Sequence, residues 1–223
     1  MSARLVRRDN RFRVTVEVGG RQVAAHLPNS GRLTELLTPG RPCWLEPIAS
    51  PRRKTGYDLR LVVFAGVLVS VDARLPNPLL AEALEEDRLI PFQGYTAYRR
   101  EVTLGQSRID FQLQMPEGPL WMESKSVTLV ERGVALFPDA PTGRGTRHVE
   151  ELMRVAGHGH RAAIVFVVQR PDALCFSPHS EADPAFSEAL RLAAHRGVAV
   201  HAWTCQVDRE AIAIGEKIPV ELA

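Results

Sequence analysis

The stretch S-R-I-D-F-Q-L-Q-M-P-E-G-P-L-W-M-E-S-K-S-V-T-L, residues 107–129, predicts two adjacent antiparallel strands. Its first eight residues alternate in character, as in a strand whose side chains point to opposite faces in turn. One face carries Arg108, Asp110, Gln112 and Gln114, and the other carries Ile109, Phe111 and Leu113. A turn, P-E-G-P, separates this strand from a second one, which we expect over residues 120–130.

Glu123 and Lys125 are two charged residues inside the second, largely apolar strand. Residues i and i+2 of a strand share a face, so the two side chains project together. Pairing with the first strand would bring Asp110 to the same side. Buried opposite charges usually cost more in desolvation than their attraction returns, so this arrangement needs an explanation.

A bound divalent cation would explain why two carboxylates and an ammonium converge, because nearby carboxylates otherwise repel each other. We expect Asp110 and Glu123 to bind Mg²⁺ or Mn²⁺, which can activate a water and polarise a phosphoryl oxygen. Lys125 would orient that water or stabilise the charge of the transition state. This is the chemistry of phosphodiester hydrolysis. The alternative is an ion pair on an edge strand, and the pattern alone favours neither.

The segments around this hairpin predict an α/β layer with a mixed sheet, α+β over the whole chain. Helical spacing is found at residues 79–87 and 146–156, and Asp183-Pro184 is typical of the start of a third helix that ends at Gly197. The continuous apolar run at residues 162–168 indicates a strand covered on both faces, and residues 198–203 a further strand.

The first sixty residues instead contain short alternating segments, at residues 4–8, 12–18, 21–27, 42–48 and 57–64. Gly19-Gly20 between two of them indicates a hairpin. We expect a small barrel, with an OB-like barrel as one candidate and a sandwich fragment as the alternative. The break L-P-N-P at residues 75–78 divides the chain into domains over residues 1–75 and 76–223.

The amino-acid composition limits the classes of protein to which this chain can belong. The 223 residues are 45% hydrophobic and 24% charged, which is typical of a globular protein. The three cysteines are widely spaced, so we expect neither a disulfide framework nor a zinc site. There is no signal-peptide pattern or membrane-length apolar run, so we expect a soluble cytoplasmic protein, with association with the nucleoid as one option.

Charge is distributed unevenly along the chain. Residues 1–60 carry 12 Lys and Arg against 5 Asp and Glu, a charge of +7, whereas residues 61–223 carry 16 against 21, a charge of −5. The N-terminal domain is therefore the part expected to meet a polyanion.

The positions Asp110 and Glu123-Ser124-Lys125 resemble the D…E-x-K core of the PD-(D/E)XK nuclease superfamily. The resemblance implies that Glu82, on the preceding helix, joins Asp110 and Glu123 as a metal ligand and catalytic residue. Ile109 stands where the superfamily has its proline, which does no chemistry.

A narrower resemblance covers almost the whole chain. The segments H-L-P-N-S-G-R-L, R-R-K-T-G-Y-D-L, S-R-I-D-F, E-S-K-S-V-T-L and F-P-D-A-P-T-G-R-G-T-R-H-V-E-E-L-M are similar to the sugar fermentation stimulation protein (SfsA) family. This resemblance implies an N-terminal OB-like domain, a nuclease-like C-terminal domain, and DNA binding linked to regulation of sugar metabolism. Ser124 stands where it implies valine, which we expect to weaken core packing only.

Basic residues that could bind nucleic acid occur in three segments. These are the loop residues Arg52, Arg53 and Lys54, the turn residue Arg32, and Arg144, Arg147 and His148 at the start of a helix, whose N-terminus attracts phosphate. Each has a plainer interpretation: charge runs are usually solvated, P-N-S-G-R could be an ordinary turn instead of an anion-binding nest, and His148 could pair with Glu151.

Two functions remain open at this point. The first is a Mg²⁺-dependent nuclease whose partner is nucleic acid, with DNA favoured. The second is a non-catalytic, regulatory DNA-binding protein that retains a nuclease-like scaffold. Clustered carboxylates repel phosphate unless a cation intervenes, which favours the nuclease. A homodimer is left open.

Overall fold

Strands near the N-terminus form a closed barrel. The computed structural model describes residues 1–50 and 53–222. The strands of the barrel domain are β1 (Ser2–Asn10), β2 (Arg13–Val18), β3 (Arg21–His26), β4 (Pro42–Pro47), β5 (Tyr57–Phe64) and β6 (Val67–Ser70). They pair in the order β3-β2-β1-β4-β5-β6, and a parallel contact of β3 with β5 closes β1 to β5 into a barrel. The expected barrel is therefore confirmed, and the sandwich fragment is excluded.

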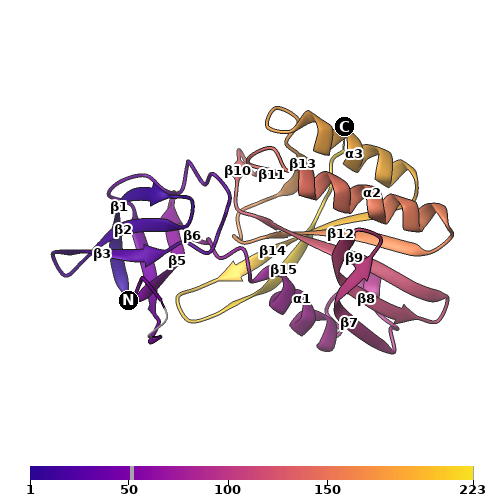
Figure 1. Ribbon diagram of the computed structural model, residues 1–223, viewed down its shortest axis with the longest axis horizontal. Coiled ribbons are helices and arrows are strands. Elements are labelled where there is room, and N and C mark those ends of the chain that lie inside the picture. The colour runs from indigo at the N-terminus through magenta and orange to yellow at the C-terminus, as the bar shows by residue number, and fades with distance from the viewer. Residues whose placement is uncertain (51–52, 223) are drawn as a thin grey trace.

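A mixed sheet with helices on both faces makes up the second domain (Figure 1). Its elements are α1 (Pro76–Glu85), η1 (Ile90–Phe92), β7 (Ala97–Leu104), β8 (Ser107–Met115), β9 (Gly118–Val127), β10 (Val130–Glu131), β11 (Val134–Phe137), α2 (Gly143–Gly157), β12 (Arg161–Val168), β13 (Cys175–Pro178), α3 (Pro184–His195), β14 (Ala199–Val207) and β15 (Ile212–Ile218). The main sheet runs β15-β14-β12-β9-β8-β7, with β9, β12 and β14 parallel. Within the described residues, no helix is long and apolar enough to span a membrane.

The sheet separates a core under α2 and α3 from a core under α1. Strand β12 contributes to both, since Ile164 and Phe166 face α2 and α3 whereas Ala163 and Val165 face the other way. This double burial confirms the interpretation of its continuous apolar run. Helix α3 begins as predicted, because the Asp183 side chain accepts a hydrogen bond from the backbone amide of Phe186.

Several strands lie where the sequence indicated none. Strand β7 and strand β15 form the two edges of the main sheet, and β10, β11 and β13 make a small separate sheet. Most side chains of β7 are exposed or half-buried, so its sequence lacks the apolar alternation that indicates a strand. Edge strands tolerate such charged sequences because only one side of the backbone is paired.

The barrel and the second domain contact each other at several points. The backbone amide of Ser70 donates to the carbonyl of Gln169 over 3.0 Å. The hairpin of β14 and β15 reaches the barrel (Figure 1), where the Arg209 guanidinium lies 5.8 Å from the ring centre of Trp44. The position of the barrel relative to the sheet is thus set by packed side chains as well as by the linker.

His201 on β14 is expected to make stability depend on pH. It packs against the rings of Phe92 and Trp203, and burial, with the charge of Lys217 as a smaller cause, lowers its pKa to about 4. The unfolded chain takes up this proton near pH 6.5, so falling pH favours unfolding between the two values. We expect the free energy of unfolding to fall by about 2–3 kcal/mol over this window from this residue.

Urea denaturation at pH 7 and pH 4 measures this contribution. The variant His201→Phe should show a correspondingly smaller pH dependence than the unaltered protein. The control is His158→Phe, which changes an exposed histidine. Equal pH dependence in the two variants would contradict the assignment to His201.

Candidate active site

A cavity of about 340 Å³ lies where β8 and β9 separate, and it brings Asp110, Glu123 and Lys125 together. Its lining also includes Ser30 and Ala73 from the barrel side and the residues Arg74, Asn77, Ser124, Ser126, Arg144 and His148. The convergence expected from the i, i+2 spacing is therefore present.

The strands separate at Asp110 because side chains replace the backbone ladder there. Paired residues of β8 and β9 end at Phe111 and Met122. Beyond them the Asp110 amide donates to Glu123 Oε2 over 3.3 Å, and the Ser124 amide donates to Asp110 Oδ2 over 2.8 Å. The strict alternation predicted for β8 breaks at this point, since Ile109 packs under α2 whereas Phe111 packs under α1.

Glu123 is held by two cationic or polar partners. Its side chain is almost fully buried, and Oε1 accepts hydrogen bonds from Lys125 Nζ, 2.5 Å away, and from His148 Nδ1. Burial alone would raise the pKa of Glu123, but the charge of Lys125 and the bond from His148 outweigh it and hold the pKa below its ordinary value. Glu123 is therefore ionised at neutral pH.

Arg144 determines how His148 is oriented. Arg144 Nε donates to His148 Nε2 over 3.3 Å, so Nε2 is the acceptor and Nδ1 carries the proton donated to Glu123. His148 is largely buried in the lining of the cavity, and Glu151 pairs with Arg154 rather than with it. The local pair with Glu151 is not formed, and phosphate binding by His148, which lines the cavity, stays a prediction. His148 positions Glu123.

Asp110 is in a different electrostatic environment. Its carboxylate accepts from Asn77 Nδ2 over 2.7 Å and from Ser124 Oγ over 2.8 Å. Burial, followed by the charge of Glu123, raises its pKa despite these bonds and the charge of Lys125. Asp110 is therefore the more readily protonated of the two carboxyl groups.

Glu82 is not part of this cluster. It is exposed on α1, because Leu79, Leu80 and Ala83 occupy the face of the helix that packs on the sheet. The residue that α1 contributes is Asn77, whose only signal in the sequence is its place between two prolines at the helix start. Among residues 1–50 and 53–222, no three His, Cys, Asp or Glu side chains are grouped so as to hold a metal ion by themselves.

Ser124 has a role that the sequence did not indicate. Its hydroxyl lies between Asp110 Oδ2, at 2.8 Å, and Asn77 Oδ1, at 2.5 Å. The sequence predicted only weaker core packing for Ser124, and it did not predict this polar contact. Ser124 thus ties α1 and β8 to the strand that carries Glu123 and Lys125.

The basic loop of the barrel is only partly available to a ligand. Arg52 lies outside the described residues, and Lys54 is exposed. Arg53 is bonded to the buried carboxylate of Asp58, which lowers the pKa of Asp58 against the effect of burial. Arg53 therefore stabilises the barrel through this pair.

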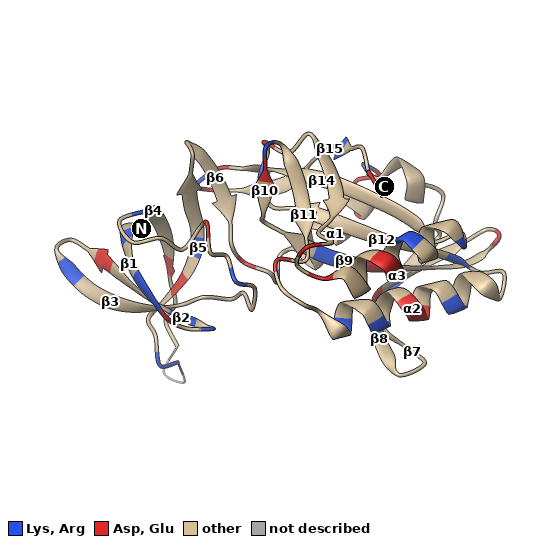
Figure 2. Cartoon of the chain, turned by 90° about the horizontal axis from the view of Figure 1, so that it is seen from above, with Lys and Arg blue, Asp and Glu red and all other residues tan. Residues whose placement is uncertain are grey.

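The remaining basic candidates are exposed. Arg32 lies on the barrel side, Arg144 lines the rim of the cavity, and Arg147 is on α2 outside the cavity lining. Figure 2 shows that Lys and Arg positions are spread over strands and loops of the barrel and along α2, with acidic positions between them. Of these three residues, Arg144 is the one that lines the cavity.

A carboxylate of the second domain lies next to the turn at Pro28–Arg32. The backbone amide of Leu33 donates to Asp139 Oδ2 over 3.1 Å, and that of Gly31 donates to Asn29 Oδ1 over 2.8 Å. Asp139 thus binds one backbone amide beside the turn, and the anion-binding nest within the turn stays a prediction.

Comparison with known proteins agrees with this architecture. Residues 6–71 match the family described as SfsA N-terminal OB domain, and residues 74–211 match the sugar fermentation stimulation protein RE domain. The chain belongs to the sugar fermentation stimulation protein family. Among its relatives, a sugar fermentation stimulation protein homolog of Moorella thermoacetica is 45% identical, covering 100% of this chain and 97% of the relative. One of Chloroflexus aurantiacus is 44% identical over 99% of this chain and 85% of the relative.

A solved member of the sugar fermentation stimulation protein family has the same fold. The structure described as Pyrococcus furiosus SfsA in complex with Ca²⁺ superimposes with a TM-score of 0.91 and 32% sequence identity, covering 99% of this chain and 95% of that one. The order of barrel and mixed sheet is thus a property of the family.

Proposed function

We propose that this protein hydrolyses phosphodiester bonds of nucleic acid in a reaction that requires Mg²⁺ or Mn²⁺. The observation that carries the proposal is the convergence of Asp110, Glu123 and Lys125 in one cavity beside Arg144. Two carboxylates, a lysine and an arginine are the groups needed to hold a divalent cation and a phosphate together. DNA is the first substrate to test.

The donor set fits a divalent cation. Asp110 and Glu123 present carboxylate oxygens, the ligands that Mg²⁺ prefers, and water would complete the shell because no third acidic side chain joins them in the described residues. The relative whose description names Ca²⁺ has the same fold, and Ca²⁺ also takes oxygen ligands. When bound, such a cation would polarise a phosphoryl oxygen and lower the pKa of a water.

The side chains of the cavity would have separate roles in holding the cation and the phosphate. Glu123 is held in one orientation by His148, so a ligand oxygen is in place before substrate arrives. Lys125 would donate to the negative charge that develops on the phosphate, and Arg144 would fix a neighbouring phosphate oxygen. Asn77 and Ser124 hold the Asp110 carboxylate in position.

A second candidate is a non-catalytic, regulatory DNA-binding protein. The observation in its favour is that the oxygens of Asp110 and Glu123 already accept hydrogen bonds from protein groups. In a protein that only binds DNA, carboxylates in this cavity would repel the phosphates unless a cation were present. We therefore favour the enzyme.

The two candidates are separated by one assay. Labelled single-stranded DNA, duplex DNA and RNA are incubated with the purified protein in Mg²⁺, Mn²⁺ or EDTA, and calorimetry measures metal binding in parallel. We expect metal-dependent cleavage of at least one nucleic acid and metal binding that is lost in Asp110→Asn. Nucleic-acid binding without cleavage under any condition would support the second candidate.

Lys54 and Arg53 are expected to behave differently despite being neighbours. Lys54→Ala should weaken nucleic-acid binding and reduce the dependence of log affinity on log salt concentration by about one phosphate contact. Arg53→Ala should instead destabilise the barrel, because it leaves the buried Asp58 with fewer partners. Affinity measured at several salt concentrations, together with melting temperature, distinguishes these effects, and an unchanged salt slope in Lys54→Ala would remove this loop from the interface.

A further inference from the structure

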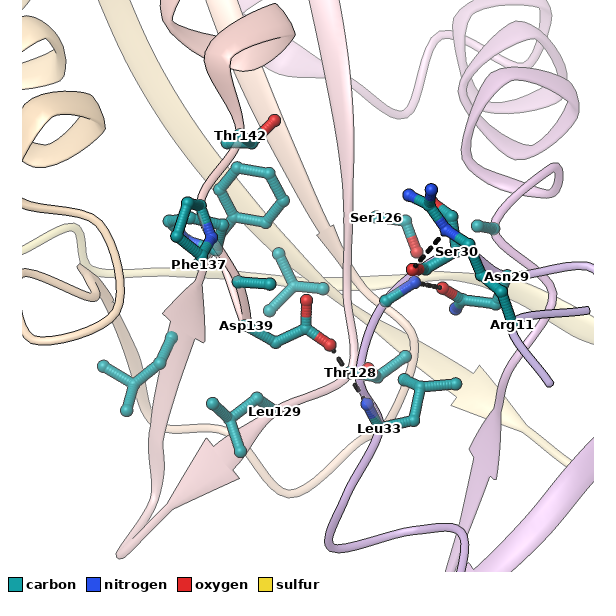
Figure 3. A pocket seen from close by; sticks show the side chains of 17 residues that line it. Arg11, Asn29, Ser30, Leu33, Ser126, Thr128, Leu129, Phe137, Asp139 and Thr142 are labelled. Carbon is teal, nitrogen blue, oxygen red and sulfur yellow. Dashed lines mark hydrogen bonds between the residues drawn. The ribbon is translucent and has the colours of Figure 1, made fainter. Parts of the chain in front are cut away.

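A second cavity, of about 230 Å³, lies between the barrel and the second domain (Figure 3). Its walls are the turn at residues 29–33, the strand end at residues 126–129 and the segment at residues 136–142. It shares Ser30, Ala73 and Ser126 with the cavity that contains Asp110 and Glu123. The two cavities are therefore contiguous.

The walls of this cavity are held in place by specific contacts. Asn29 is buried and links the Gly31 amide to the Val71 carbonyl. Asp139 accepts from the Leu33 amide, and a Cβ atom on Gly31 would lie only 2.6 Å from Asp139 Oδ2. A preformed shape of this kind is typical of ligand sites.

The lining combines apolar and hydrogen-bonding groups. Its apolar residues include Leu33, Leu129, Phe137 and Ala140, and its polar residues include Asn29, Thr128 and Asp139. Figure 3 shows Asp139 between the two walls, with one oxygen bonded to the Leu33 amide. No donor within the described residues is bonded to its other oxygen, Oδ1, which can accept from a ligand N–H. A flat heterocycle with N–H edges matches this combination.

The rim of the cavity continues into a surface suited to single strands. Arg11 lines the cavity, donates to the Ser30 carbonyl over 3.2 Å, and lies 5.5 Å from the ring centre of Phe12. Phe12 is 47% exposed, so its ring is accessible from solvent. Exposed aromatic rings next to arginine are typical of surfaces on which unpaired bases stack.

We propose that this cavity binds one unpaired nucleobase of a strand whose phosphate lies in the active-site cavity. The inference rests on the proposed function and specifies its substrate as single-stranded or locally unpaired nucleic acid. A base within a duplex stays stacked and cannot enter a side cavity without leaving its partner. A duplex would thus leave this cavity unused.

The test uses binding by Lys125→Ala in Mg²⁺, so that cleavage does not interfere. Three probes are compared at one salt concentration: a single-stranded DNA, a strand of equal length with every base removed, and a duplex. Ala140→Leu, added to this background, fills the second cavity, because Ala140 lines it and not the active site. The matched control is Ala211→Leu, an exposed loop position near Arg209.

We expect Ala140→Leu to weaken binding of the intact single strand about tenfold and to leave binding of the base-free strand and the duplex unchanged. Ala211→Leu should leave all three unchanged. Equal effects of Ala140→Leu on the intact and base-free strands, or none on either, would overturn the inference.

The outcomes also separate this inference from the proposed function. Base-dependent binding that Ala140→Leu removes, with no cleavage by the unaltered protein, would retain the base site and refute the nuclease. Cleavage by the unaltered protein, with no base-dependent effect of Ala140→Leu, would support the nuclease and refute the base site. Failure to bind any of the three probes would overturn both.

Discussion

Lys125→Ala is expected to reduce metal-dependent cleavage about a thousandfold while changing affinity for nucleic acid only a few-fold. Lys125 is the ammonium closest to both carboxylates, and removing one group that stabilises developing charge costs about 10²–10³ in rate. Cleavage rate under single-turnover conditions and affinity in a filter-binding assay give the two quantities. The matched control is Lys217→Ala, an exposed lysine on β15.

Asp110→Asn complements this variant because it preserves the shape of the side chain and removes its charge. We expect a comparable loss of cleavage together with loss of metal binding, since the amide is a poor ligand for Mg²⁺. Melting temperatures must stay close to that of the unaltered protein for the result to concern chemistry. Full activity in both Lys125→Ala and Asp110→Asn would refute the proposed site.

Arg170→Ala is expected to produce the largest loss of stability, about 3–5 kcal/mol. Arg170 is 1% exposed, and its guanidinium binds both oxygens of Asp172, at 2.6 and 2.7 Å, and the Thr128 carbonyl. It also lies 5.4 Å from the ring centre of Phe64 in the barrel. Its removal leaves a cavity, an unpaired Asp172 and a lost contact between the domains.

Denaturant unfolding followed by tryptophan fluorescence measures this effect. The control is Arg7→Ala, which removes an exposed arginine from its pair with Asp9 and should cost at most about 1 kcal/mol. Similar losses in the two variants would show that burial of Arg170 does not determine its contribution. A loss confined to Arg170→Ala is the expected result.

The sequence predicted the parts of the fold that depend on local patterns. The hairpin of β8 and β9, the doubly buried β12 and the capped start of α3 each follow from residue spacing or from one capping side chain. Strand β7 did not, because an edge strand lacks the apolar alternation of a buried one. The sequence also predicted that Asp110, Glu123 and Lys125 converge, but not the separation of β8 and β9 at Asp110 that opens the cavity.

The parts of the site that could not be predicted depend on contacts between distant segments. Glu82 has the right residue type, but the rotation of α1 leaves it exposed and brings Asn77 to Asp110 instead. The orientation of His148 toward Glu123 depends on where α2 packs on the sheet. Neither the rotation of α1 nor the packing of α2 can be predicted from the spacing of residues within a single helix or strand.

The presence of Ser30 and Ala73 in the wall of the active-site cavity has a consequence for protein engineering. The barrel cannot be treated as an interchangeable module, because Ser30, between β3 and β4, and Ala73, after β6, form part of the wall of the candidate active-site cavity. A chimaera that joins the barrel of one relative to the sheet of another would inherit a hybrid substrate site. Under the proposed function, its preference for nucleic acid should therefore differ from that of both parents.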